Sequence, residues 1–336
     1  MRLFLYLAAV LGLATSIALV GFYGFANIGL AIAGAGWGIV AVVAFHLLQT
    51  GFSAEAWRTV LPPSSAPGFP TMFRLRWIRE AVNALLPFAQ IGGEFVGARL
   101  LALRHVPVSA AGASVTVDLS LEMITQIIFT LFGVGLLTVR PHDEQITRWI
   151  LGATAAATAV VIAFVLTQRF GLFRLIERGL IRFSRLTGWT TWGQVDGLHE
   201  AIVAVYRDPR RLCLSSGHHL LSWLLGGVEV LLALHFLGVE VDLREGLIIE
   251  SLGQASRAVG FAVPGSLGVQ EAGYILVCGL VGVAPQAAIE LSLIKRIREV
   301  LLGVPGLVAW QIVEGRRLAR YMAPRGSKRS SSELTP

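Results

Sequence analysis

The chain has 336 residues, of which 54% are hydrophobic and 15% are charged, and its formal net charge at pH 7 is +7. An average soluble domain has about 25% charged residues, so a soluble core of this length could not bury so much apolar side chain. This composition excludes intrinsic disorder, a secreted disulfide scaffold and an ordinary cytosolic enzyme. It predicts an all-α polytopic membrane protein, in which the positive charge belongs to cytoplasmic loops and not to a nucleic-acid interface.

Six apolar runs are long enough to cross a hydrocarbon core, which takes about 20 residues. In chain order they cover residues 3–23, 30–49, 109–138, 149–167, 214–237 and 286–311. Two further apolar regions, 74–105 and 246–284, are interrupted by Pro and Gly. They predict two broken or re-entrant helical hairpins, each of which returns the chain to the side from which it entered.

The arginines orient these helices. Eight Arg lie in 168–211, six basic residues lie in 313–336, and the loops on the opposite side are poor in Arg. The positive-inside rule therefore predicts that both termini are cytoplasmic. We expect one integral membrane domain over 1–315, with a basic amphipathic segment within 169–211 that attracts anionic lipid headgroups, and a disordered basic tail over 316–336.

The sequence contains a weak internal repeat. A shift of 177 positions aligns Pro87 with Pro264, Glu94 with Glu271, and Glu122 with Glu299. The repeats would cover about 74–138 and 246–311. Because the first hairpin enters from inside and the second from outside, the repeat would be inverted, as in many transporters. The alternative is a set of similar helices without symmetry.

Charged residues interrupt two of the predicted spans. A charge near the bilayer centre costs about 2.5–3.5 kcal/mol even on the lenient insertion scale, so such residues face a cavity or each other. Asp118 and Glu122 lie on one stripe of the third run, and Lys295, Arg298 and Glu299 share a face of the last run. Since Asp118 and Lys295 occupy the same repeat position, we expect them to form an ion pair or to line one cavity. Two roles remain open, locking helices together or binding a polar headgroup.

The two hairpins each place an acidic residue seven positions beyond a proline. Glu94 and Glu271 are expected in the first turn of a half-helix, either as helix caps or as headgroup or proton sites. The adjacent His218 and His219 are expected at a membrane interface. The sequence contains no phosphate-binding loop, zinc motif or nucleophile motif, so we expect no cofactor, no metal and no enzymatic activity.

Three stretches carry a family resemblance: residues 79–87, Gly92-Gly93-Glu94 with Arg99, and residues 264–271. They resemble the flippase-like family typified by the transmembrane region of lysylphosphatidylglycerol synthase. Residues 293–299 are more similar to the subgroup associated with hopanoid biosynthesis. The resemblance implies a multi-pass protein of the bacterial inner membrane that moves lipids between leaflets. The chain has no aminoacyltransferase domain, so lipid lysylation is not implied.

The expected function is lipid translocation or lipid handling, with hopanoids as one candidate lipid and with membrane lipid as the partner. A proton-coupled transporter of a small solute and a non-transporting scaffold for lipid-biosynthesis enzymes are the alternatives. The candidate substrate-binding or translocation residues are Asn83, Glu94, Arg99, Asp118, Glu122, Glu271, Lys295, Arg298 and Glu299.

Overall fold

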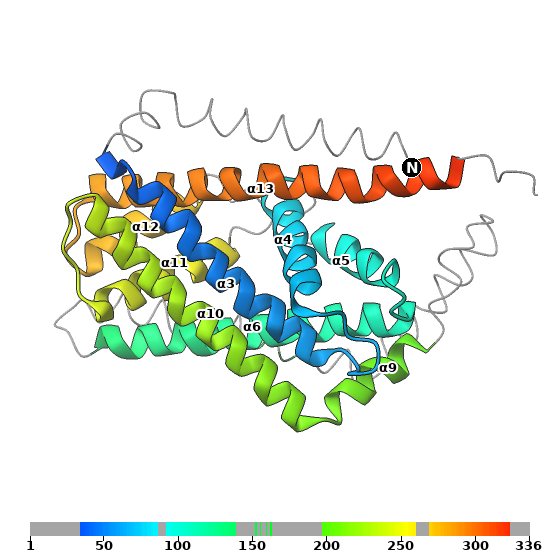
Figure 1. The fold of residues 1–336 in the computed structure, drawn as a ribbon. Helices are drawn as coiled ribbons and strands as arrows, with labels where there is room; N and C mark the ends of the chain where they lie inside the picture. Colours follow the sequence, from blue (N-terminus) through cyan, green and yellow to red (C-terminus); the bar gives the residue numbers. More distant parts are fainter. Residues whose placement is uncertain are drawn as a thin grey trace, which may run out of the picture.

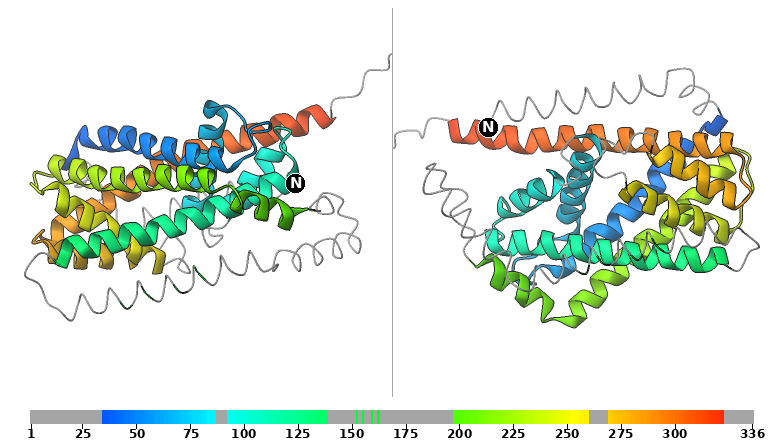
Figure 2. Two further views of the ribbon diagram at one scale, coloured as in Figure 1. Left: turned by 90° about the horizontal axis from the view of Figure 1, so that it is seen from below. Right: turned by 180° about the vertical axis from the view of Figure 1, so that it is seen from behind.

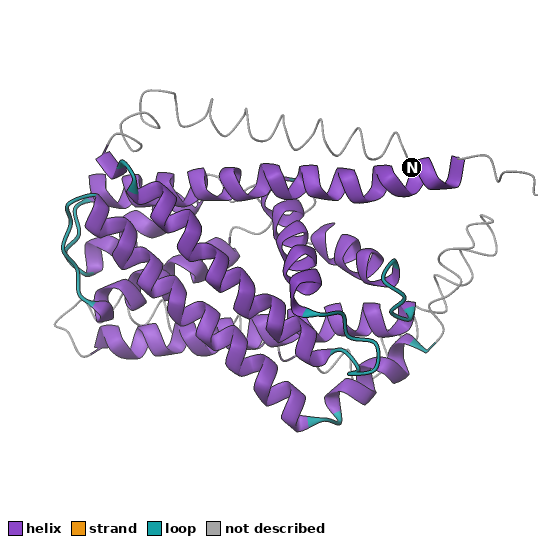
Figure 3. Ribbon diagram, viewed as in Figure 1, coloured by secondary structure: helices purple, strands orange, loops and turns teal. Residues whose placement is uncertain are grey.

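The computed structural model describes residues 34–86, 92–138, 197–259 and 269–322, together with the single positions 152, 155, 159 and 162. These residues form helices joined by loops, and no strand occurs among them (Figure 3). The predicted span 3–23, most of 149–167, the amphipathic segment and the tail beyond Met322 lie outside this part of the chain.

Nine helices lie in the described residues. They are α3 (Gly38–Val60), α4 (Phe69–Leu85), α5 (Gly92–Ala102), α6 (Val108–Thr138), α9 (Leu198–Tyr206), α10 (Pro209–Phe236), α11 (Leu243–Val259), α12 (Val269–Leu280) and α13 (Pro285–Met322).

Three of these helices, α3, α6 and α10, are long and apolar enough to cross a membrane. Large apolar side chains such as Ile128, Phe132 and Val308 are exposed on the long helices, as expected where lipid covers the surface. An all-helical, multi-pass membrane protein is therefore confirmed.

The helix bounds agree with the apolar runs in some places and differ in others. Helix α6 matches the predicted run 109–138 within one residue. Helix α3 continues to Val60, beyond the predicted end at 49, through a more polar segment in which Glu55 and Arg58 form an i,i+3 ion pair at 2.5 Å. The helix is therefore longer than its apolar run.

The two interrupted regions each contain two helices. Helices α4 and α5 occupy the first region, and α11 and α12 occupy the second. The connections that contain Pro87 and Pro264 lie outside the described residues. The loops of the first hairpin region, 61–68 and 103–107, lie at one end of the molecule, whereas 237–242 and 281–284 lie at the opposite end (Figures 1 and 3).

The long helices form a frame around these hairpins. Helices α13 and α6 form opposite edges and run in opposite directions (Figures 1 and 2). Helices α3 and α10 cross the frame side by side, also in opposite directions, and pack closely on each other. Ser53 and Ser222 meet at this contact, with their Oγ atoms 3.1 Å apart.

Two pairs of helices begin at the spacing of the predicted repeat. Helices α5 and α12 begin 177 residues apart, and so do α6 and α13. The packing exchanges partners between the halves: α4 packs against α13, and α11 packs against α6. The helix ends also correspond, because His105 after α5 and Gly282 after α12 both have a positive φ, of 66° and 84°.

Candidate functional site: two buried charge networks

The first charge network joins α4, α5, α6 and α10. Its centre is Asp118, which is fully buried in the middle of an apolar helix. The network consists of Arg76, Arg79, Glu80, Glu94, Asp118, Glu122 and His219.

Arg79 connects the hairpin to α6. Its Nη1 donates to Asp118 Oδ2 at 2.5 Å, and its Nη2 lies 2.6 Å from Glu94 Oε2. The guanidinium also lies over the ring of Trp57, 5.2 Å from the centroid. Arg79 exposes only 1% of its surface, so carboxylates and an aromatic ring replace water as its surroundings.

Arg76 binds the next carboxylate along α6. It donates through both Nη atoms to Glu122, at 2.6 and 3.1 Å, and through Nε to Glu80 at 2.6 Å. His219 from α10 lies on the other side of Asp118, with Nε2 3.0 Å from Oδ1. One carboxylate of α6 is thereby shared between α4 and α10.

Asn83 closes the hairpin locally. Its Nδ2 donates to Glu94 Oε1 at 3.1 Å, and its Oδ1 accepts from the backbone N–H of Gly93 at 2.7 Å. A methyl group on Gly93 would lie 2.6 Å from Asn83 Oδ1 and closer still to the Arg79 carbonyl oxygen. Glycine is required here by this close approach of α5 to α4.

The second charge network joins α3, α10, α11, α12 and α13. All its members except His46, Arg257 and Glu271 expose less than a tenth of their surface. It consists of His46, Glu229, Glu250, Arg257, Glu271, Lys295, Arg296, Arg298 and Glu299.

Glu229 holds α10 to α3 and α13. It accepts hydrogen bonds from Arg298 and from the Gln49 amide, and His46 Nδ1 lies 2.9 Å from its Oε2. A single buried carboxylate thus ties both central helices to the long C-terminal helix. Removing one member of such a set would leave the others uncompensated.

Lys295 pairs with Glu250 of α11 and lies over the ring of Tyr274, 5.6 Å from the centroid. Glu250 also accepts from Gln254 Nε2 at 2.8 Å. The ammonium is therefore held by groups of its own half of the chain.

Glu299 and Glu271 complete the second network. Glu299 accepts from Arg257 of α11 and from Arg296 at 3.1 Å. Glu271, in the first turn of α12, lies 3.5 Å from Arg296 Nη2 and accepts from Ser292 Oγ at 3.3 Å. Glu122 and Glu299 lie 177 residues apart. Glu122 binds Arg76 of α4, and Glu299 binds Arg257 of α11, so each binds an arginine of the first helix of its interrupted region.

Arg99 lies apart from both networks. Its Nε donates to Glu314 Oε1 at 2.8 Å, and Glu314 is buried. The pair joins α5 to the distal part of α13, so Arg99 contacts the opposite half of the chain.

The expected ion pair between Asp118 and Lys295 is wrong. Asp118 binds Arg76, Arg79 and His219, and Lys295 binds Glu250. The physical reason is reach: the long arginine side chains of α4 extend to Asp118 on α6, and Glu250 of α11 meets Lys295 on α13, so each charge finds its partners nearer than the other. The sequence indicated that these charges would be buried against counter-charges, but it did not indicate which residues supply them.

The expected position of His219 is also wrong. It is 1% exposed and binds Asp118, whereas His218 is half-buried. Nine residues of the networks were not recognised from the sequence as site residues: His46, Arg76, Arg79, Glu80, His219, Glu229, Glu250, Arg257 and Arg296. A signal existed for Glu229, His46 and Glu250, because each is an ionisable residue inside an apolar run.

The two networks differ in charge balance. Within the described residues, the first contains two arginines and four carboxylates, and the second contains four cationic side chains and four carboxylates, with one histidine in each. Among the described residues, the first network therefore has more carboxylates than cationic side chains, and the second has equal numbers of each. None of the described residues forms a cluster that could hold a metal ion.

Comparison with known families identifies the class. The family model described as the lysylphosphatidylglycerol synthase transmembrane region matches residues 9–306. The chain belongs to this family, which agrees with the resemblance carried by the hairpin motifs, and a lipid-related membrane function follows. Comparisons with curated proteins and with solved structures gave no significant match.

Proposed function

We propose that this protein is a lipid translocator that moves a lipid between the leaflets of a bacterial inner membrane, with both termini cytoplasmic. The observation that carries the proposal is the pair of buried charge networks, one at each hairpin. A membrane helix that carries Asp118 or Lys295 needs a strong compensating gain, and ionisable groups at this depth mark substrate or ion pathways by default.

An inverted repeat supports this mechanism. The 177-residue spacing of helix starts, the exchanged packing of α4 on α13 and α11 on α6, and the opposite directions of α3 and α10 are the relations expected of two halves related by a two-fold axis in the membrane plane. In such an architecture, rocking of the halves opens a midplane site alternately to each side.

The charge networks would act as the closed state of each half. Arg79 binds Glu94 and Asp118, and Arg296 binds Glu271 and Glu299, so each hairpin is tied to its long helix by exchangeable ion pairs. A polar headgroup that enters between hairpin and helix would replace some of these pairs. The apolar tail would stay in the bilayer alongside the exposed apolar surface.

The particular lipid is a finer proposal. The similarity of residues 293–299 to the hopanoid-associated subgroup favours a hopanoid. We therefore propose a hopanoid as the lipid that is moved. Mass spectrometry of the lipids that copurify would separate a hopanoid from a phospholipid cargo.

A leaflet-sided assay tests the proposal. Purified protein in liposomes should expose a fluorescent lipid from the inner leaflet to an impermeant quencher, whereas protein-free liposomes should not. The Glu94→Gln, Glu271→Gln double variant should lose this activity while still unfolding in one cooperative transition, at a midpoint lowered by the loss of the Glu94 carboxylate beside Arg79. Full activity of that variant would show that both residues have only a structural role. A wild type without activity would contradict the proposal.

A second candidate is a proton-coupled transporter of a small solute. The excess of carboxylates over arginines in the first network favours it, because unmatched negative charge inside a membrane domain suits a pathway for cations or protons. Solute uptake driven by a pH gradient, with no movement of the fluorescent lipid, would favour this candidate.

A further inference from the structure

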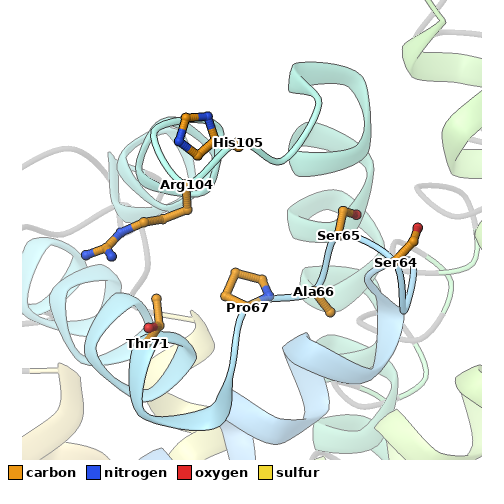
Figure 4. Close-up of a pocket in the computed structure, with 7 residues that line it drawn as sticks. All are labelled: Ser64, Ser65, Ala66, Pro67, Thr71, Arg104 and His105. Atoms are coloured by element: carbon orange, nitrogen blue, oxygen red, sulfur yellow. The ribbon is translucent and has the colours of Figure 1, made fainter.

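A hollow of about 400 Å³ lies where the α3–α4 loop meets the α5–α6 loop (Figure 4). It is separate from both charge networks. Its lining is polar and basic: Ser64, Ser65, Thr71, Arg104 and His105, with Ala66 and Pro67. This size lies at the small end of the range for ligand sites.

Most polar side chains of the hollow make no polar contact with the rest of the described structure, and Ser65 donates only to the Pro62 carbonyl oxygen at 3.4 Å. Within the described part of the chain, the side chains of Ser64, Thr71, Arg104 and His105 have no hydrogen-bond or ion-pair partner. Figure 4 shows Arg104 extending toward the start of α4, on the side of Thr71, with the two serines on the other side of Pro67. The hollow contains a cationic side chain and no acidic residue.

His105 holds a backbone conformation that its residue type does not favour. Its φ is 66°, and the backbone bonds from Val106 N to Leu101 O and from His105 N to Ala102 O form the usual C-terminal cap of a helix. That position is normally glycine, because a side chain in the left-handed region costs about 1–2 kcal/mol.

The other half of the molecule contains the same cap without these side chains. Helix α12 ends with bonds from Val283 N to Cys278 O and from Gly282 N to Gly279 O, and Gly282 has φ 84°. At the 177-residue spacing, Arg104 corresponds to Val281 and His105 to Gly282. The cap after α12 therefore forms with glycine and without a basic residue. The cap after α5, which lines the hollow, has His105 in the strained position instead.

We propose that this hollow is a phosphate-binding site. Arg104 supplies a guanidinium, which matches phosphate oxygens in geometry and charge, and His105 and the hydroxyl of Thr71 supply further donors. The phosphate could belong to a lipid headgroup at the membrane surface or be free in solution. The site lies at the end of the molecule where the arginine distribution predicts the cytoplasm, and its binding does not require that the protein transports anything.

Calorimetry in a maltoside detergent, which contains no phosphate, tests the proposal with two probes. One probe is inorganic phosphate, and the other is short-chain phosphatidylglycerol. The wild type should bind at least one probe, and Arg104→Gln should weaken binding about tenfold or more, as expected for a lost charge-assisted hydrogen bond. Tighter binding of phosphatidylglycerol identifies a lipid headgroup, and equal or tighter binding of inorganic phosphate identifies a free anion.

Two variants separate binding from folding. His105→Gly removes a donor but relaxes the backbone, so it should weaken phosphate binding while raising the unfolding midpoint. Arg210→Gln, an exposed arginine at the start of α10 and outside the hollow, should change neither quantity. Unchanged binding in both Arg104→Gln and His105→Gly, or no binding by the wild type, would overturn the proposal.

Discussion

Asp118 has more ionic partners than its position in an apolar helix would suggest, and this defines its role at the scale of single residues. It is fully buried and contacts two arginines and a histidine from two other helices. Arg76, Arg79 and His219 are buried, so water could not replace the Asp118 carboxylate as their partner. The charge on Asp118 therefore stabilises all three side chains.

Asp118→Asn should therefore be strongly destabilising. Losing one partner of a buried ionic set costs about 3–5 kcal/mol, which should appear as a large fall in the unfolding midpoint of the purified protein. The control Glu55→Gln, in a part-exposed pair on α3, should cost less than about 1 kcal/mol. The double variant Asp118→Asn, Arg79→Gln should regain part of the loss, and strictly additive losses would argue against coupling.

Sequence reasoning at this scale identified charges better than contacts. Asp118, Glu122, Lys295 and Glu299 were recognised because a charge within an apolar run is costly wherever it points. The partners Arg76 and Arg79 were not recognised, because they lie in the first half of an interrupted region where arginines also fit a membrane surface. Which counter-charge binds a buried group is decided by tertiary packing, and a single sequence does not contain that information directly.

At the scale of whole helices, the close contact of α5 with α4 depends on Gly93. Gly93 allows the backbone of α5 to reach Asn83 and the carbonyl oxygen of Arg79. That approach places Glu94 beside Arg79, so the first charge network depends on a residue with no side chain.

Gly93→Ala should separate these two helices. Alanine usually favours a helix over glycine by about 1 kcal/mol, but the clash with backbone should make this substitution destabilising and should reduce lipid movement. Gly135→Ala on α6 is the matched control, because a methyl group there meets nothing within 4 Å. The unfolding midpoints of the two variants should shift in opposite directions, and a stabilised Gly93→Ala would contradict the contact.

Helix bounds were predicted well where a helix coincides with an apolar run and poorly where a helix continues into charged segments. The bounds of α6 follow the apolar run, since both of its ends coincide with a loss of apolar residues. Helices α3 and α13 extend past the ends of their apolar runs, into segments that carry charged residues. The proline interruptions predicted two hairpins, and two helices lie in each region.

At the scale of the whole molecule, residues at the 177-residue spacing occur in both charge networks. Glu94 and Glu271 lie in the first turns of α5 and α12, and each contacts an arginine of its own half. The sequence indicated this spacing only faintly, because most positions related by it carry different residues. The starts of α5 and α12 and of α6 and α13 show the same spacing, and the inverted arrangement of the halves stays a prediction.

The most direct test of the account is the sidedness of two equivalent loop residues. Pro107 and Ala284 are both exposed, and their carbonyl oxygens accept the first backbone bonds of α6 and α13. Single cysteines at these positions, with Cys213 and Cys278 replaced by serine, would be exposed to an impermeant maleimide in intact cells.

If the halves are inverted, Ala284→Cys should be labelled from outside and Pro107→Cys only after the membrane is permeabilised. Labelling of both cysteines from the same side would contradict the inverted arrangement and the alternating mechanism that depends on it.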